Sequence, residues 1–169
     1  MPRIITARSL GLRFDNRFGA LGAETRLTGH HTAGPKDRDT NDAIRLCKQY
    51  HAAHRAKNWG GAGYHVCIAR SGTIIGLRPT ALKGAHVGGH NSGNLGVMFH
   101  GTTGDKPTAE QSKSYRWLLA NAHTRRMPKA HRTDRDMRKA QRYGHNSWSG
   151  HTTNACPATH KPLIIQGHR

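Results

Sequence analysis

Two short segments hold residue types that can bind a metal ion together. The first is the pair His30-His31 at the end of a short predicted strand, and the second is GHNSWSGHTTNACP, residues 144–157. The second segment contains three candidates, His145, His151 and Cys156. Neutral imidazole and thiolate are the usual zinc ligands, and three protein ligands with an open fourth position are typical of a catalytic zinc site. The residues alone leave a second interpretation open, in which Cys156 is a small buried apolar residue and the histidines are solvated.

Other hydrolytic chemistries have weaker support. The sequence contains no HExxH motif, which excludes the metalloprotease site with a helical glutamate base. With only 9 acidic residues, it also has no evident carboxylate pair for glycosidase chemistry. A cysteine protease built on Cys156 stays possible, but it requires a free thiolate nucleophile, whereas a zinc-bound thiolate is occupied.

The charge of the chain points to a polyanionic partner. There are 27 Lys and Arg residues against 9 Asp and Glu, which gives a formal charge of +18 with neutral histidine. Nucleic acid, anionic cell-wall polymers and anionic membrane surfaces all satisfy this electrostatic requirement. A solvated basic surface that only aids solubility is the alternative. Nucleic-acid binding rests on charge alone, because neither an aromatic–basic platform nor zinc-finger spacing is present.

The cysteines and the first residues bear on the compartment. Three cysteines, at 47, 67 and 156, are too few and too widely spaced for a disulfide framework. The start, MPRIITARSLGLRF, has scattered charges and does not resemble a secretory signal peptide. No window is long enough to cross a membrane as an apolar helix. We therefore expect synthesis in the cytoplasm, no membrane insertion, and release by another factor if the target lies outside.

Periodicity predicts a single α/β domain. Strands are expected at 25–31, 64–70, 73–78 and 94–100, with a hairpin turn at Ser71-Gly72, and helices at 41–57, 109–126 and 135–142. Asp39 or Thr40 can cap the first helix, and Thr108 with Gln111 is expected to form a capping box at the second. The tail from 145 to 169 is expected to be irregular. This order favours a central mixed sheet flanked by helices. Residues 1–24 are interpreted as a surface segment, 25–160 as the catalytic domain and 161–169 as a C-terminal tail.

Four segments, in order, resemble the zinc-dependent N-acetylmuramoyl-L-alanine amidases, the family that unites phage lysozyme-type amidases with peptidoglycan recognition proteins. They are His30-His31-Thr32-Ala33; Gly63-Tyr64-His65-Val66 with Arg70-Ser71-Gly72-Thr73; Gly84-Ala85-His86-Val87 with Gly89-His90-Asn91-Ser92 and Leu95-Gly96-Val97; and Gly144-His145 with Ala155-Cys156-Pro157. The match spans residues 28–157, most of the chain. It implies a zinc site in a surface groove of the α/β fold.

The resemblance also implies the zinc ligands. It points to His30, with His31 as the fallback, to His145 in the Gly-His step, and to the Cys156 thiolate before proline. The loop between His145 and Cys156 is longer than is usual in close relatives. His151 lies within that loop and is therefore the alternative to His145.

Catalytic and substrate-binding residues follow from the same register. In phage-type relatives the tyrosine at the position of Tyr64 lies beside the zinc and can orient the attacking water or donate to the oxyanion. If Tyr64 faces the site, strand alternation makes His65 a buried, hydrogen-bonded structural residue. The second helper is Lys or Thr in relatives but Asn154 here, with Thr153 as its rival.

Two further residues, His86 and Asn91, are expected to contact the substrate. The implied reaction is hydrolysis of the amide between N-acetylmuramic acid and L-alanine. The absence of a signal peptide suggests a phage endolysin, made in the infected cell and released to the wall, with peptidoglycan and anionic wall polymers as partners. We expect a monomer that binds no nucleic acid. The alternatives are a peptidoglycan-binding module without activity and, with less support, a basic nucleic-acid-binding protein.

Overall fold

A computed structural model describes residues 1–167 of the chain. Its centre is one six-stranded mixed sheet with the order β1-β4-β3-β5-β2-β6. The strands are β1 (Ile4–Thr6), β2 (Arg26–His31), β3 (Val66–Ile68), β4 (Ile74–Gly76), β5 (Asn94–Phe99) and β6 (Gln141–Gly144). Strands β3 and β4 pair antiparallel, and every other neighbouring pair is parallel.

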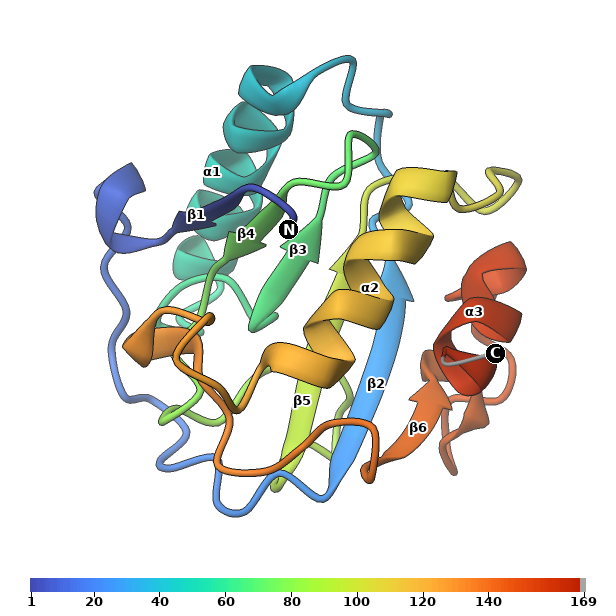
Figure 1. The fold of residues 1–169 in the computed structure, drawn as a ribbon. Coiled ribbons are helices and arrows are strands. Elements are labelled where there is room, and N and C mark those ends of the chain that lie inside the picture. Colours follow the sequence, from blue (N-terminus) through green and yellow to red (C-terminus); the bar gives the residue numbers. More distant parts are fainter. Residues whose placement is uncertain (168–169) are drawn as a thin grey trace.

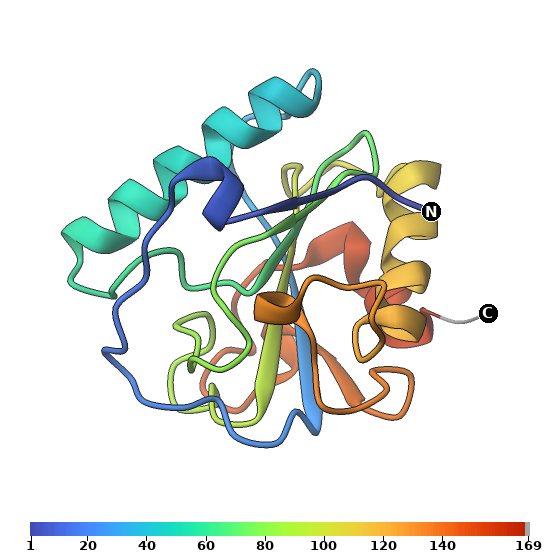
Figure 2. The same ribbon diagram turned by 60° about the vertical axis from the view of Figure 1, so that its left-hand side comes forward.

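Helices cover both faces of this sheet (Figure 1 and Figure 2). Helix α1 (Thr40–Ala56) lies on one face, whereas α2 (Ala109–Asn121) and α3 (Lys161–Gln166) lie on the other. Among the described residues, no helix is both long enough and apolar enough to span a bilayer. The structure therefore confirms the predicted α/β architecture with a central mixed sheet.

Strand alternation divides the core into two layers. In β3, Val66 and Ile68 pack towards α2 and α3, whereas Cys67 between them packs towards α1. The same alternation in β5 sends Phe99 to one layer and Met98 to the other. Because neighbouring residues of a strand point to opposite faces, each central strand supplies both cores.

Several local predictions are confirmed. Asp39 caps α1 by accepting a hydrogen bond from the backbone N–H of Asp42 at 2.8 Å. Thr108 and Gln111 form a reciprocal capping box at the start of α2. The turn between β3 and β4 contains Gly72 at φ +81°, a left-handed conformation that glycine adopts without strain. These signals are local in sequence, so they could be recognised without knowledge of the tertiary structure.

The predicted helix over 135–142 is wrong. Residues 141–144 instead form β6, which pairs parallel with β2. The segment is short and rich in basic residues, and the available hydrogen bonds at the sheet edge outweigh its weak helical pattern. Helix α2 also ends earlier than expected, at Asn121, and the tail expected to be irregular contains α3. Residues 168 and 169 lie outside the described part of the chain.

Buried histidines make the stability of this fold depend on pH. Burial lowers the pKa of His65 to about 3 and that of His131 to about 4, from an ordinary value near 6.5. In the unfolded chain these histidines therefore bind protons near pH 6.5, whereas in the folded chain they bind protons only at a lower pH. We expect the free energy of unfolding to fall as pH drops from about 6.5 to 4, by up to about 1.4 kcal/mol per pH unit for each histidine.

Urea unfolding at several pH values in this window measures the effect. The variant His131→Gln should give a shallower slope than the wild type, because the histidine that resists protonation in the folded state is removed. A free energy of unfolding that stays constant across the window would contradict this account.

Candidate functional site

Three potential metal ligands from distant parts of the sequence converge at one end of the sheet. One ligand atom each of His30, His145 and Cys156 lies within 4.8 Å of the others. The Cys156 Sγ atom is 3.7 Å from His30 Nδ1, and the His30 and His145 rings have centroids 4.8 Å apart. The structure therefore brings together the three residues that the sequence pattern singled out.

The register between β2 and β6 explains why the two histidines meet. The strands pair parallel with Gly29 opposite Gly144, so the next residues, His30 within β2 and His145 directly after β6, lie side by side. Both lie at the carboxyl ends of their strands, where open α/β sheets commonly place functional groups. The edge strand missed from the sequence is thus the element that positions one of the ligands.

The spacing of the donor atoms fits a metal ion. A tetrahedral ion with a metal–sulfur distance of about 2.3 Å and a metal–nitrogen distance of about 2.05 Å separates sulfur from nitrogen by roughly 3.6 Å. The observed 3.7 Å between Cys156 Sγ and His30 Nδ1 matches this geometry. The backbone N–H of His31 also donates to the same sulfur at 3.3 Å, which favours a thiolate.

A chain of hydrogen bonds fixes the tautomer of His30. The Nε2 atom of His86 lies 3.0 Å from the carbonyl oxygen of Asn94, and because a carbonyl only accepts, Nε2 must donate. In a neutral ring, Nδ1 of His86 is then the acceptor, and it lies 3.1 Å from His30 Nε2. His30 therefore donates from Nε2 and presents the lone pair of Nδ1 to Cys156.

A second chain of the same kind fixes His145. The Nε2 atom of His151 donates to the carbonyl oxygen of Gly88 at 3.1 Å. Its Nδ1 atom lies 3.1 Å from His145 Nε2, so His145 donates from Nε2 and presents Nδ1. His151, the alternative ligand, thus lies behind His145 in this arrangement.

The histidines are held in the neutral form that metal binding requires. Burial, followed by the charges of neighbouring histidines, lowers the pKa of His30 well below its ordinary value. The pKa of His86 and that of His145 are each lowered to about 4, again mainly by burial. Burial raises the pKa of the Cys156 thiol to about 11, so a cation beside it is needed for thiolate at neutral pH.

Glycine makes room for the first of these chains. A Cβ atom at Gly96 would lie 2.6 Å from His86 Cδ2, and one at Gly84 would lie 2.7 Å from the same atom. The His86 ring therefore fits against β5 only because both positions lack a side chain. His86 is buried, and both of its ring nitrogens already have partners within the protein.

A groove of about 510 Å³ opens beside the cluster. Its lining includes the predicted residues Tyr64, His86, Asn91 and His145. The Tyr64 ring packs edge-on against His30 with centroids 5.0 Å apart. Burial and, next, the nearby Cys156 sulfur raise the pKa of the Tyr64 hydroxyl, so it stays protonated and able to donate.

The end of α1 contributes groove residues that the sequence analysis missed. His54, Lys57 and Trp59 line the groove, and Lys57 lies over the Trp59 ring at 5.2 Å from its centroid. His54 also accepts a hydrogen bond from the backbone N–H of Gly63 at 2.9 Å, next to Tyr64. The signal that could have found them is the segment NWGGAG, residues 58–63, in which an aromatic residue stands directly before glycines.

The other predicted residues have defined places. His31 points away from the cluster, with Nε2 3.0 Å from the Thr103 hydroxyl, as alternation along β2 requires.

Asn91 accepts hydrogen bonds from the backbone N–H groups of His86 and Val87 and so shapes the groove loop. Asn154 and its neighbour Thr153 are both exposed and lie just before Cys156. The side-chain oxygen of Asn154 accepts a hydrogen bond from the backbone N–H of Cys156 at 2.9 Å.

His65 is fully buried. Its Nδ1 atom accepts from the backbone N–H of Gly96 at 2.9 Å, and Nε2 lies 3.0 Å from the Leu82 carbonyl oxygen. The predicted structural role of His65 is confirmed.

The long loop between His145 and Cys156 is anchored by Trp148. The indole N–H donates to the Thr28 hydroxyl at 2.9 Å, and this hydroxyl in turn donates to Asn94 Oδ1 at 3.0 Å. The indole also stacks on His90 with ring centroids 4.6 Å apart. Trp148 thereby fixes the loop to β2 and β5 while the two candidate ligands stay at its ends.

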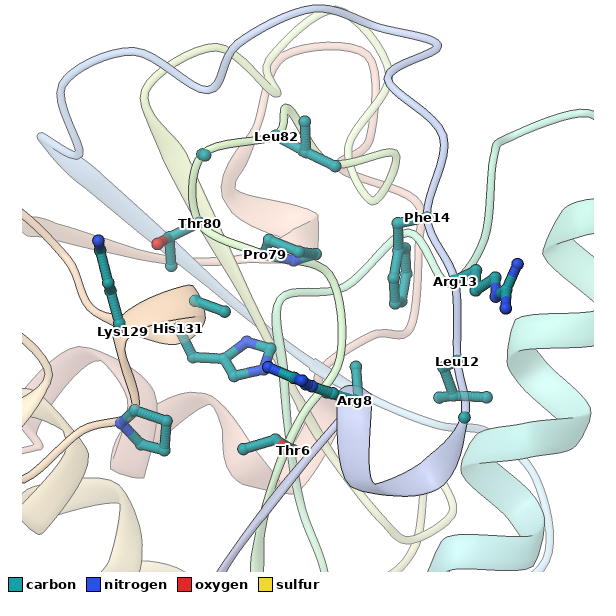
Figure 3. Close-up of a pocket in the computed structure, with 15 residues that line it drawn as sticks. Thr6, Arg8, Leu12, Arg13, Phe14, Pro79, Thr80, Leu82, Lys129 and His131 are labelled. Carbon is teal, nitrogen blue, oxygen red and sulfur yellow. The ribbon is translucent and has the colours of Figure 1, made fainter.

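A larger cavity, of about 920 Å³, lies elsewhere on the molecule (Figure 3). It is bounded by the N-terminal segment, the turn after β4 and residues 128–131, with Phe14, Pro79 and His131 among its walls. None of its lining residues belongs to the cluster of His30, His145 and Cys156. The convergent ligand atoms, and not the size of a cavity, therefore point to the candidate functional site.

Solved structures with this fold are known. The chain superposes on the Drosophila peptidoglycan recognition protein SD with a TM-score of 0.81 at 21% identity, covering 98% of this chain and 94% of that one. For wild-type Drosophila PGRP-LB the TM-score is 0.78 at 19% identity, with 98% and 92% covered. At these identities the likeness establishes the fold.

Sequence comparison identifies relatives and a family. The chain is 33% identical over 85 residues to the endolysin of Escherichia phage T7, which covers 47% of this chain and 54% of that protein. It is 37% identical over 58 residues to the endolysin of Klebsiella phage KP32, which covers 34% and 36%. The chain thus spans about half or less of the length of these curated relatives. Residues 23–159 match the profile described as N-acetylmuramoyl-L-alanine amidase, and the chain therefore belongs to this family.

Proposed function

We propose that the protein hydrolyses the amide bond between N-acetylmuramic acid and L-alanine in peptidoglycan, with a zinc ion held by His30, His145 and Cys156. The convergence of these three ligand atoms within 4.8 Å, beside a groove, is the observation that carries the proposal. Family membership supports the same reaction. A zinc ion held by these residues would supply a Lewis acid able to activate water at neutral pH.

The residues around the cluster have separate roles in this proposal. Tyr64 donates a hydrogen bond to the oxyanion that develops on the substrate carbonyl, because its hydroxyl remains protonated. Asn154, or Thr153 beside it, is the second donor. Asn91 shapes the substrate loop, and His86 acts by orienting His30 as well as by lining the groove.

The charge of the chain and its sequence relatives indicate where the protein acts. The formal charge of +18 attracts the protein to anionic wall polymers, which raises the encounter rate with peptidoglycan. The endolysins of phages T7 and KP32 support a role in lysis from within an infected cell, followed by release to the wall. We propose that the protein acts as a monomer.

Removing the thiolate ligand should abolish wall digestion. For Cys156→Ser we expect release of soluble fragments from purified peptidoglycan to fall by at least about 100-fold, because Lewis-acid stabilisation contributes several kcal/mol. Chelation of the wild type should have the same effect, and added zinc should restore it. Wall binding without digestion by the zinc-loaded wild type would favour a binding module, and digestion that survives complete metal removal would contradict the zinc mechanism.

The two hydrogen-bond chains predict unequal effects at neighbouring histidines. His145→Ala should eliminate stoichiometric zinc binding at this site, whereas His151→Ala and His86→Ala should weaken zinc affinity by about 10–100-fold, the usual effect of losing a group that orients a ligand. Competition with a chromophoric chelator measures these affinities. If His151→Ala removed the ion and His145→Ala retained it, the ligand assignment would have to be reversed.

The role of Tyr64 can be separated from metal binding. For Tyr64→Phe we expect kcat to fall by about 100-fold or more with an unchanged zinc content, since a donor to the oxyanion is lost. The matched control is Tyr143→Phe, because the Tyr143 hydroxyl bonds to Gln141 away from the ligand atoms. Equal kcat values for wild type and Tyr64→Phe would rule out this role.

A further inference from the structure

A second cluster of metal-binding residue types lies inside the core, apart from the groove. One ligand atom each of Cys47, Cys67 and His100 lies within 4.8 Å of the others. They come from three elements: α1, β3 and the residue directly after β5. All three side chains are fully buried, with 0% of their surface exposed. The proposed peptidoglycan chemistry does not use any of them.

The geometry of this cluster resembles that of the first one. The Cys47 Sγ atom lies 3.8 Å from His100 Nε2, close to the roughly 3.6 Å that a tetrahedral ion imposes between sulfur and nitrogen ligands. Behind the ring, His100 Nδ1 lies 3.3 Å from a carboxylate oxygen of Asp37. A carboxylate on the far nitrogen of an imidazole is the usual arrangement around a metal-bound histidine.

Asp37 is itself held in place. Its two carboxylate oxygens accept from the backbone N–H of Arg70 at 3.0 and 3.3 Å, and the side chain is almost completely buried. A buried carboxylate needs such partners, since an isolated charge in the core is costly. The loop before α1 is thereby tied to the end of β3, with His100 between them.

Burial decides between the possible roles of this cluster. A Cys–His–Asp row is also the arrangement of a nucleophilic triad, but the Cys47 sulfur has no access to a substrate. Two thiolates and an imidazole are a soft donor set that selects zinc or copper(I) over magnesium or calcium. Two thiolates also cancel the charge of a divalent ion, so the bound ion is compatible with the apolar surroundings.

We propose that Cys47, Cys67 and His100 form a second, structural metal site for a thiophilic ion such as zinc, oriented by Asp37. The site joins α1 to the two central strands β3 and β5. Met98 in β5 pairs with Cys67 in β3 on one side and with His30 in β2 on the other, so strand β5 lies between this site and the groove cluster.

Metal counting with zinc alone as the probe tests the proposal. After loading with zinc and removal of excess, native mass spectrometry should find two ions on the wild type and one on Cys156→Ser, whose groove site is disabled. The triple variant Cys47→Ser/Cys67→Ser/Cys156→Ser should retain none, and the double variant Cys47→Ser/Cys67→Ser should retain one. A wild type with one ion and a folded Cys156→Ser variant with none would overturn the proposal and leave a hydrogen-bonded thiol pair.

Cobalt(II) provides a readout that does not depend on wall digestion. Cobalt-loaded Cys156→Ser should show a thiolate-to-cobalt charge-transfer band that disappears in the triple variant, while circular dichroism verifies that each variant is folded. An unchanged cobalt spectrum after loss of Cys47 and Cys67 would also refute the site. Failure of the groove mechanism would instead remove digestion and the ion bound by Cys156, and it would leave this band intact.

Discussion

The parallel pairing of β2 with its two neighbours is the constraint on which the rest of the site depends. Its register with β6 sets Gly29 opposite Gly144 and so places His30 beside His145. Its register with β5 places His30 opposite Met98, and Met98 in turn lies opposite Cys67 in β3. Shifting either register by one residue would send His30 to the opposite face, because side chains alternate along a strand. The groove cluster depends on the pairing of β2, whereas the core cluster depends on the pairing of β3 with β5.

The two clusters differ in what stands behind their histidines. In the groove, each candidate histidine ligand is backed by a second imidazole and then by a main-chain carbonyl, from Asn94 in one case and Gly88 in the other. In the core, His100 is backed by the carboxylate of Asp37. A carboxylate raises the basicity of the ligand and lowers the positive charge of the site. With ions bound as proposed, neutral backing would leave the groove ion more electrophilic and suited to activation of water, whereas the core cluster would be suited to tight retention of its ion.

Local signals in the sequence were sufficient for much of the fold. The cap at Asp39, the capping box at Thr108 and the turn at Gly72 each depend on residues within a few positions, and all three were recognisable. Strand β6 was mistaken for part of a helix because its stability comes from pairing with β2, more than a hundred positions away in sequence. The three-residue strand β1 is too short to show a periodic pattern.

The candidate site was predictable to the extent that its motifs are contiguous. His30 and Cys156 stood out through their sequence neighbours. Which of His145 and His151 faces the cluster depends on the bond from His151 to the Gly88 carbonyl, and only the folded loop determines that. Cys47, Cys67 and His100 belong to no sequence motif. A helix face, a strand interior and a strand end bring them together, and each alone looks like an ordinary core residue.

The anchoring of Trp148 has a consequence for how this loop can diversify. Its indole is fixed to Thr28 and stacked on His90, so the segment between His145 and Cys156 is divided into two smaller loops with a common fixed point. Changes in length or charge that spare His151, which crosses this point to orient His145, need not propagate from one loop to the other. The other residues of this loop, at the rim of the groove, can therefore change while the positions of the candidate ligands stay the same.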